Sequence, residues 1–180
     1  MKKLSNLAWI DLEMTGLDYE NNVIVEIASI VTDKDLNILA EGPSFVIQAS
    51  EYDLAKMNDF VVAMHTKSGL IEAIKQSKIS INEAQKKTLE FFEKYCFPGL
   101  SPLCGNSIWQ DRRFLKKYMS ELDNFFSYRI IDVSSVKEIV RRWYPDNVAT
   151  EFKKSETHRA LEDIYQSIAE LNHYRKNFFV

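Results

Sequence analysis

The first third of the chain contains short apolar runs separated by turn signals. Leu7 to Glu13 is apolar and aromatic and stops at a Thr-Gly turn, which predicts a buried strand. Val23 to Val31 is rich in Val and Ile, and two shorter apolar runs, Leu36 to Ala40 and Phe45 to Ile47, are separated by Gly42-Pro43-Ser44. Together these segments predict three neighbouring antiparallel strands.

Helical spacing replaces the strand pattern from Glu51 onward. Met57 to Thr66 and Gly69 to Lys75 are predicted short helices. Ser80 followed by Glu83 is a capping-box signature, and the apolar residues after it follow one helix face until Pro98-Gly99. A longer amphipathic helix is therefore predicted between these two signals.

The second half of the chain alternates strands with helices. Ser135 and Glu138 form another capping box, which predicts a helix that Pro145 closes. The remaining predicted elements are, in chain order, a strand at Leu103 to Asn106, a helix at Gln110 to Met119, a strand at Arg129 to Val133, a loop at Asn147 to Glu156, and a helix from near Thr157 toward Lys176 with Ala160, Ile164, Ser167, Ile168 and Leu171 on its inner face. This order predicts a layered α/β or α+β domain with a mixed sheet.

Composition and charge narrow the classes of protein that fit the chain. Its 180 residues suit one domain, and 46% hydrophobic with 27% charged residues is typical of a folded globular protein. Lys and Arg number 23 against 26 Asp and Glu, a net charge of −3, and the paired basic residues are scattered. This charge has the wrong sign for a protein that grips long nucleic acid over its whole surface.

The sequence also bears on the cellular compartment. Two cysteines, Cys96 and Cys104, are too few for the disulfide framework of a small secreted domain. The apolar stretch Leu7 to Ile10 is interrupted by Asp11 before it forms a signal-peptide core, and no window approaches the ~18 apolar residues of a membrane span. We therefore expect no membrane association and a cytoplasmic location.

Two carboxylates share one face of the first predicted strand. Asp11 and Glu13 are two residues apart, so they project to the same side about 7 Å apart along the chain. One interpretation places them on the solvated face of an edge strand. The apolar neighbours Leu7 and Trp9 favour an interior strand instead, where paired like charges have to be neutralised or compensated by a cation.

Three further residues are candidates for the same site. Asp163 lies about 100° from the centre of the apolar face of the last helix, so it borders the core and can point at the strand carboxylates. His158 near the helix start and Asp111 in the first turn of its own helix could join them. Taken singly, each could instead be an exposed helix-edge acid, a cap-region histidine or an acid that complements a helix dipole.

Four converging carboxylates have a clear chemical use. They supply the oxygen ligands that hard divalent cations prefer. Two such ions about 3.5–4 Å apart can activate a water and neutralise the leaving oxygen in phosphodiester cleavage. A histidine with a pKa near ~6.5 is suited to accept the proton from that water.

Three segments of the chain resemble the exonuclease motifs of the DEDDh superfamily, and within it most closely the oligoribonuclease family. They are, in order, Trp9 to Leu17, Gly105 to Leu115 and His158 to Asp163. The resemblance covers nearly the whole chain. Two positions depart from the family pattern: Phe60 stands where the family usually has Trp, and Trp109 stands where it has a small residue beside the metal site.

The resemblance implies a fold and an activity. The fold would be ribonuclease-H-like, an α/β single domain with a five-stranded mixed sheet flanked by helices, with residues 6–171 as the exonuclease domain and 172–180 as a C-terminal tail. The activity would be removal of nucleoside 5′-monophosphates from the 3′ ends of very short RNAs, dinucleotides above all. The assembly would be a homodimer.

The resemblance also implies roles for individual residues. Two Mg²⁺ or Mn²⁺ ions would be bound by Asp11, Glu13, Asp111 and Asp163, with His158 as general base and Tyr128 in a catalytic or substrate role in cis or across a dimer interface. Base contacts would come from Leu17, Phe60 and His65, and contacts to the terminal phosphate from Ser107, Arg129, Ser134 and Ser135. Without the resemblance, Leu17 reads as ordinary core, His65 as a surface or capping histidine, and Arg129 as a solvated edge residue.

Other functions share some of these features. A processive exonuclease on longer RNA or DNA would use the same catalytic residues, but the scattered basic residues do not form the stripe that a long polymer requires. A catalytically inactive binding module would be expected to lack one or more of the four acids, and none is missing. Aromatic residues near the C-terminal helices suggest a dimer interface, and they are Trp143, Tyr144, Tyr174, Phe178 and Phe179.

Overall fold

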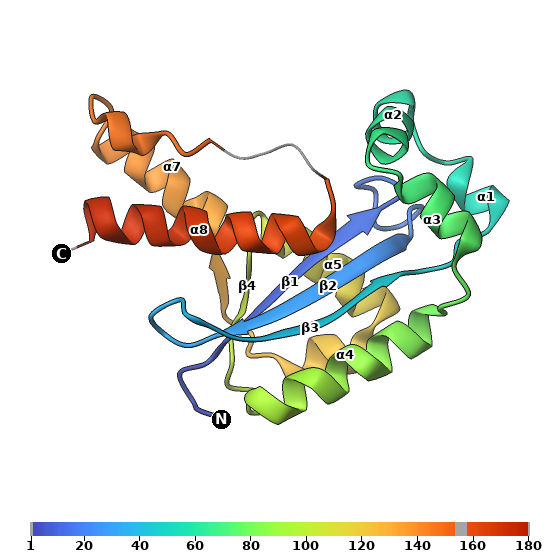
Figure 1. Ribbon diagram of the computed structural model, residues 1–180, viewed down its shortest axis with the longest axis horizontal. Helices are drawn as coiled ribbons and strands as arrows, with labels where there is room; N and C mark the ends of the chain where they lie inside the picture. The colour runs from blue at the N-terminus through green and yellow to red at the C-terminus, as the bar shows by residue number, and fades with distance from the viewer. Residues whose placement is uncertain (1, 154–157, 180) are drawn as a thin grey trace.

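The computed structural model describes residues 2–153 and 158–179, and its centre is a five-stranded mixed sheet flanked by helices (Figure 1). In the order β3-β2-β1-β4-β5, β1 pairs antiparallel with β2 and parallel with β4. The strands are β1 (Leu7–Met14), β2 (Ile24–Thr32), β3 (Ile38–Val46), β4 (Leu103–Gly105) and β5 (Ile130–Asp132). The predicted trio of antiparallel strands is confirmed, and β1 is an interior strand.

The third strand differs from its prediction. The segment Gly42-Pro43-Ser44 was expected to separate two apolar runs, whereas β3 continues through it. A Cβ atom at Gly42 would lie 2.5 Å from the ring of Phe91, so glycine is needed there for close helix packing rather than for a turn. Pro43 is tolerated because β3 is an edge strand.

Helices cover both faces of the sheet. In Figure 1, α8 and α7 lie above one face of the sheet, α4 and α5 lie against the other face, and the short helices α1 to α3 gather at one end. The helices are α1 (Glu51–Leu54), α2 (Asp59–Lys67), α3 (Leu70–Gln76), α4 (Ile81–Tyr95), α5 (Ile108–Tyr118), α6 (Ser120–Phe125), α7 (Val133–Trp143) and α8 (Ala160–Phe178), with a 3₁₀ turn at Val148–Thr150. Among the described residues, none of these helices has the length and apolarity needed to cross a membrane.

The helix caps show where capping signals predict correctly and where they do not. Ser80 caps α4 as predicted, since its side chain accepts a hydrogen bond from the Glu83 N–H. The prediction that Ser135 caps the next helix is wrong, because α7 already begins at Val133. Its cap is Asp132, whose side chain accepts from the Ser134 N–H at 2.9 Å. The carboxylate at the end of β5 therefore starts the helix directly after the strand.

The last helix begins later and ends later than expected. Its predicted start at Thr157 lies outside the described residues, and α8 runs from Ala160 to Phe178. The segment from residue 172 to 178, predicted as a tail, is therefore helical. Tyr174 within it is fully buried, so it cannot contribute exposed surface to a dimer interface.

Side chains of β1 alternate between the two layers. Ala8, Ile10 and Leu12 belong to the core cluster under α4 and α5, whereas Trp9 belongs to the cluster under α7 and α8. The Trp9 indole N–H donates to the Thr32 hydroxyl at 3.0 Å, which satisfies its only polar atom in the core. By the period of two, Asp11 and Glu13 lie on the Trp9 side, toward α8.

Candidate active site

Three carboxylates from two elements converge at one end of β1. Asp11 and Glu13 come from β1 and Asp163 from the first turn of α8, and one oxygen atom of each lies within 4.8 Å of the others. Asp163 reaches this position because α8 is anchored on the sheet through Ala160, Ile164 and Ile168. The expected convergence of the strand pair with Asp163 is present.

The fourth predicted acid approaches β1 from the opposite layer. Asp111 lies in the first turn of α5, is buried, and accepts a hydrogen bond from the Leu12 N–H at 3.0 Å. Its carboxyl group is thus fixed to the backbone between Asp11 and Glu13. Burial is the main cause that raises its pKa, to about 7.

Glu13 is a buried carboxyl group surrounded by other acidic side chains. Burial first, and then the charges of Asp163, Glu26 and Asp111, raise its pKa to about 8, while Arg159 acts in the opposite direction. Carboxylates that are buried or half-buried and lie within 4.8 Å of one another are costly to ionise unless a cation compensates their charges. An all-carboxylate donor set of this kind fits a hard divalent ion such as Mg²⁺ or Mn²⁺.

A pocket of about 360 Å³ adjoins Glu13. Leu17 and Phe60 line it, and both side chains are exposed, at 70% and 73%. Exposed apolar side chains beside a carboxylate suit a ligand with one flat apolar part and one charged part. The structure therefore brings two of the three predicted base contacts to the carboxylate site.

The third predicted base contact is placed differently. His65 is fully buried, its Nε2–H donates to the Met14 carbonyl oxygen at 2.9 Å, and its Nδ1 lies 3.9 Å from a Glu13 oxygen. Burial is the main cause that lowers its pKa. His65 lies behind Glu13 and is not among the residues that line the pocket. A stacking role would require its ring to become exposed.

His158 stands two residues before the first residue of α8, with Arg159 between them. It is half-buried and its backbone has φ of +48°, a left-handed conformation that is uncommon for a residue other than glycine. The next residue, Arg159, donates from Nε and Nη2 to the Glu26 carboxylate at 2.7–3.2 Å. Glu26 is only 1% exposed and lies opposite Glu13 in the β1–β2 register.

Sequence reasoning missed Glu26 and gave Arg159 no role. One signal was available, because Glu26 is the one charged residue in a strand that is mostly apolar and whose residues are all buried. A lone charge inside such a strand is nearly always paired. Its partner could not be found from the pattern, because Arg159 lies 133 residues later.

Of the four residues predicted to contact the terminal phosphate, Ser107 and Ser134 are bonded neighbours, whereas Arg129 and Ser135 are separate exposed residues. The Ser107 N–H donates to Asp132 Oδ1 at 2.9 Å and to Ser134 Oγ at 3.0 Å, and the two hydroxyls lie 3.1 Å apart. Ser107 and Ser134 are thus neighbours, joined by Asp132, which the sequence did not single out. Arg129 is exposed at the start of β5, and Ser135 is exposed on α7.

Tyr128 lies in a second hollow, of about 390 Å³, with Trp109 and Arg113 among its lining residues. Tyr128 is 78% exposed, and the Arg129 guanidinium lies 4.6 Å from its ring centre. The two hollows share no lining residue. Trp109 therefore does not line the pocket beside Glu13.

Known proteins resemble this chain over nearly its whole length. A family model described as Exonuclease matches residues 8–171. The oligoribonuclease of Vibrio parahaemolyticus is 56% identical over 174 residues, which cover 97% of this chain and 96% of that protein. The oligoribonuclease of Pseudomonas fluorescens is 53% identical over 178 residues, covering 99% and 98%.

Solved structures of exonucleases share the fold. The zinc-bound form of an E. coli exonuclease I complex with single-stranded DNA has a TM-score of 0.75 at 15% identity and covers 98% of this chain. Exonuclease I from Methylocaldum szegediense has a TM-score of 0.69 at 16% identity. This chain spans about two fifths of either protein, 41% in both cases. The ribonuclease-H-like fold is thereby confirmed.

Proposed function

The chain belongs to the oligoribonuclease family of exonucleases, and we propose that it is a 3′-to-5′ exoribonuclease acting on short RNAs, dinucleotides above all. Water adds across the phosphodiester bond: the phosphate keeps the 5′ oxygen of the released mononucleotide, and the 3′ oxygen of its neighbour leaves with a proton. The observation that carries the proposal is the convergence of Asp11, Glu13 and Asp163 beside an apolar pocket.

Asp11, Glu13, Asp111 and Asp163 would hold two divalent ions, Mg²⁺ or Mn²⁺. When bound, these ions supply the positive charge that activates the attacking water and offsets the charge on the leaving oxygen. The chain's contribution is a rigid ligand set, since Asp11 and Glu13 belong to an interior strand and Asp111 is fixed to the Leu12 N–H.

His158 is proposed as the general base, accepting the proton of the attacking water. Its position two residues before the start of α8, with Asp163 in the first turn of that helix, supports this role. Tyr128 is proposed as an additional catalytic or substrate-contacting residue. A contribution across a dimer interface is supported by its exposure and by its place in a hollow separate from the Glu13 pocket.

Substrate contacts are proposed at both ends of a short RNA. Leu17 and Phe60 would contact bases, since both line the pocket beside Glu13, and aromatic stacking accepts any base. Ser107 and Ser134 would bind the terminal phosphate, supported by their adjacency, with Arg129 and Ser135 completing the set. A short substrate also suits a chain with a net charge of −3.

We propose that the protein is a homodimer. The exposed aromatic residues Trp143 and Phe179 near the ends of α7 and α8 support this assembly. A cytoplasmic location is supported by the two cysteines, which are both free and buried.

A direct comparison of substrates tests the proposed function. Purified protein with Mn²⁺ should convert a labelled RNA dinucleotide to mononucleotides faster than it shortens a long unstructured RNA at equal concentration. Equal rates would contradict the short-substrate proposal and would favour the processive alternative.

Variants then test the site. Asp11→Ala or Asp163→Ala should abolish turnover while the circular dichroism spectrum stays that of the wild type. His158→Ala should lower kcat by about 10²–10⁴-fold if His158 is a general base. His173, half-buried and bonded to the Ala149 carbonyl, offers a matched control, because His173→Gln should leave kcat unchanged.

A further inference from the structure

We propose that Glu26 and Arg159 are a positioning pair that fixes His158 relative to the carboxylate cluster, without either residue touching ions or substrate. This inference rests on the proposed function, from which His158 takes its role. Three N–H donors meet the Glu26 carboxylate: Arg159 Nε at 3.0 Å, Arg159 Nη2 at 2.7 Å and the Ala160 backbone N–H at 3.2 Å. A single buried carboxylate thus holds two consecutive residues that follow His158.

The geometry of this contact is unusually restrictive. Glu26 projects from β2, a strand whose residues are all buried, and its own side chain is only 1% exposed. A planar guanidinium bound through two nitrogens is fixed in direction as well as in distance. Arg159 is therefore held against β2 at Glu26, the residue that lies opposite Glu13 in the β1–β2 register.

His158 depends on this contact more than Asp163 does. Asp163 lies inside α8, which is also anchored in the core by Ile164 and Ile168, residues that make no contact with Glu26 through the three donors named above. His158 lies outside the helix and has a left-handed backbone, which costs energy and persists only where neighbouring contacts enforce it. Among the residues that the structure describes, the Glu26–Arg159 contact is the restraint adjacent to His158.

A conservative substitution separates position from charge. Arg159→Lys keeps the positive charge but removes the two-nitrogen contact. We expect kcat on the RNA dinucleotide to fall by about 10²-fold, the order of loss for a misplaced catalytic group, with KM within about twofold. Mn²⁺ affinity measured by calorimetry should stay at the wild-type value, because the ligand-bearing elements are undisturbed.

The chain offers a control in a second Arg–Glu pair, which is exposed and bonded through one guanidinium nitrogen, Nη2. Arg141 donates to both oxygens of Glu151, on an exposed surface away from the carboxylates. Arg141→Lys should leave kcat unchanged. If Arg159→Lys behaves like Arg141→Lys, the positioning role is wrong.

A double-variant cycle distinguishes positioning from a general loss of stability. If the pair acts through His158, adding Arg159→Lys to His158→Ala should lower kcat no further. Additive losses would overturn the inference. Glu26→Asp, which keeps the charge but shortens the side chain, should reproduce the Arg159→Lys loss and serves if the lysine variant folds poorly.

One readout does not depend on turnover. The chain has three histidines, so the His158 ring signal in a ¹H–¹³C NMR spectrum can be assigned from the His158→Ala variant. In Arg159→Lys this signal should shift or broaden, while in Arg141→Lys it should not. An unmoved signal would overturn the inference even if activity fell, and a wild-type protein inactive on dinucleotides would instead overturn the proposed function.

Discussion

At Glu13, folding favours the protonated carboxyl group. Its pKa rises from 4.5 to about 8, chiefly through burial and next through Asp163. Because the folded-state pKa lies above the unfolded one, the stability contributed by the protonated form is complete below pH 4.5 and is lost as the pH rises through about 8. In EDTA, the Tm should therefore fall across this window.

Addition of Mn²⁺ should raise the Tm most at the alkaline end of the window, where the carboxylates are ionised and ready to bind. Differential scanning calorimetry at several pH values measures both effects. Glu13→Gln, which cannot ionise, should flatten the slope in EDTA. A slope that is the same in both proteins would show that Glu13 does not carry this titration.

At the residue scale, the sequence predicted what depends on local periodicity. The shared face of Asp11 and Glu13 followed from the strand period, and the position of Asp163 beside the core followed from the helix period. The contact between Glu26 and Arg159 joins two elements far apart in the chain, so no local pattern contained it. The burial of His65 likewise depends on how α2 packs against the end of β1.

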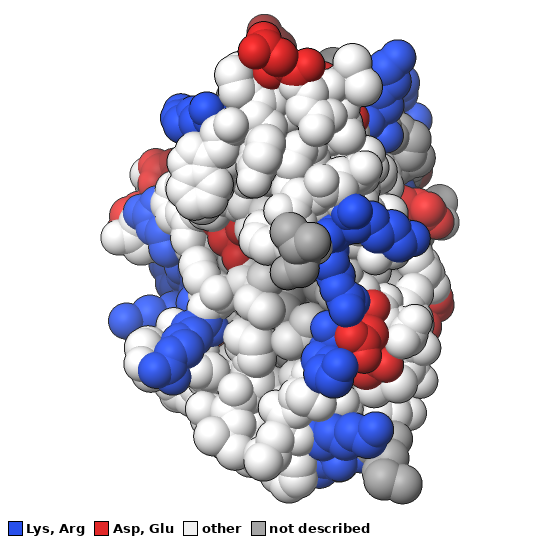
Figure 2. All heavy atoms as spheres, turned by 90° about the vertical axis from the view of Figure 1, so that its left-hand side faces the viewer, with Lys and Arg blue, Asp and Glu red and all other residues white. Residues whose placement is uncertain are grey.

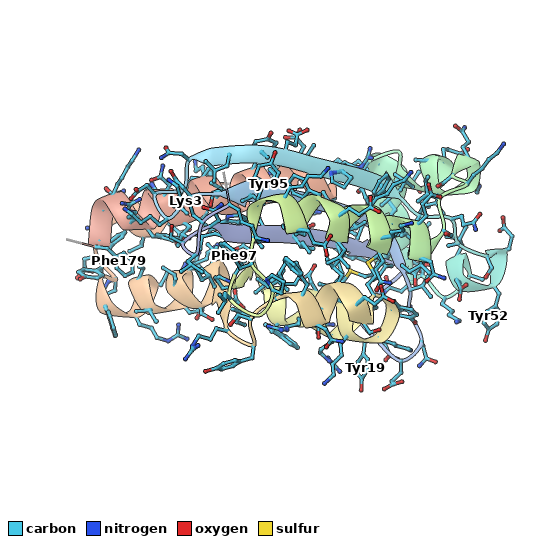
Figure 3. All side chains as sticks on the ribbon, turned by 90° about the horizontal axis from the view of Figure 1, so that it is seen from below. Lys3, Tyr19, Tyr52, Tyr95, Phe97 and Phe179 are labelled. Atoms are coloured by element: carbon cyan, nitrogen blue, oxygen red, sulfur yellow. The ribbon has the colours of Figure 1, made fainter. Side chains whose placement is uncertain are left out.

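At the element scale, α5 holds the loop that follows β1. The Gln110 amide donates to the Leu17 carbonyl at 2.6 Å, and Lys117 Nζ donates to the carbonyls of Tyr19 and Glu20 at 2.8 and 2.7 Å. The Arg113 guanidinium lies 3.9 Å from the Tyr19 ring centre, and Figure 3 shows Tyr19 on the outer side of this helix. The helix that carries Asp111 therefore also anchors Leu17 at the pocket.

We expect Gln110→Ala to raise the KM for an RNA dinucleotide by about 2–10-fold, the worth of one hydrogen bond, with kcat little changed. The physical reason is that Leu17 loses a restraint while the carboxylates keep theirs. Steady-state kinetics checks this. Gln85→Ala on α4 is the matched control, since Gln85 is half-buried and bonds to the Glu121 N–H, away from the pocket. A lower kcat at unchanged KM would contradict the anchoring role.

Elements were predicted well where one signal dominates and poorly where two compete. Ser80 stands alone before α4, and the cap was found. Before α7, Asp132 and Ser135 both qualify, and the carboxylate at the end of β5 takes the role. Gly42 and Pro43 resemble a turn, yet close packing against Phe91 and an edge position place them within β3.

At the scale of the whole molecule, uncharged surface gathers at one end. Figure 2, which views the left-hand side of Figure 1, shows Lys and Arg on both sides of a broad strip that is mostly uncharged and has few acidic atoms within it. This end carries α7 and the last turns of α8, where Trp143 is 73% and Phe179 60% exposed. Large aromatic residues exposed together are typical of protein interfaces. The ring centres of Tyr144 and Phe178 lie 4.9 Å apart, and this contact joins the C-terminal ends of α7 and α8.

Dimerisation through this end should respond to a single buried charge. Light scattering of the wild-type protein at micromolar concentration should give twice the mass of one chain, and Trp143→Glu should give one, because a carboxylate in an apolar interface is desolvated without a partner. Tyr52→Glu is the matched control: Tyr52 is 74% exposed, and Figure 3 places it at the opposite end from Phe179. A wild-type monomer would contradict the homodimer, and a Trp143→Glu dimer would place the interface elsewhere.

If Tyr128 acts across the interface, the monomeric variant should also lose turnover on dinucleotides while it keeps the affinity for Mn²⁺, since the carboxylate ligands belong to one chain.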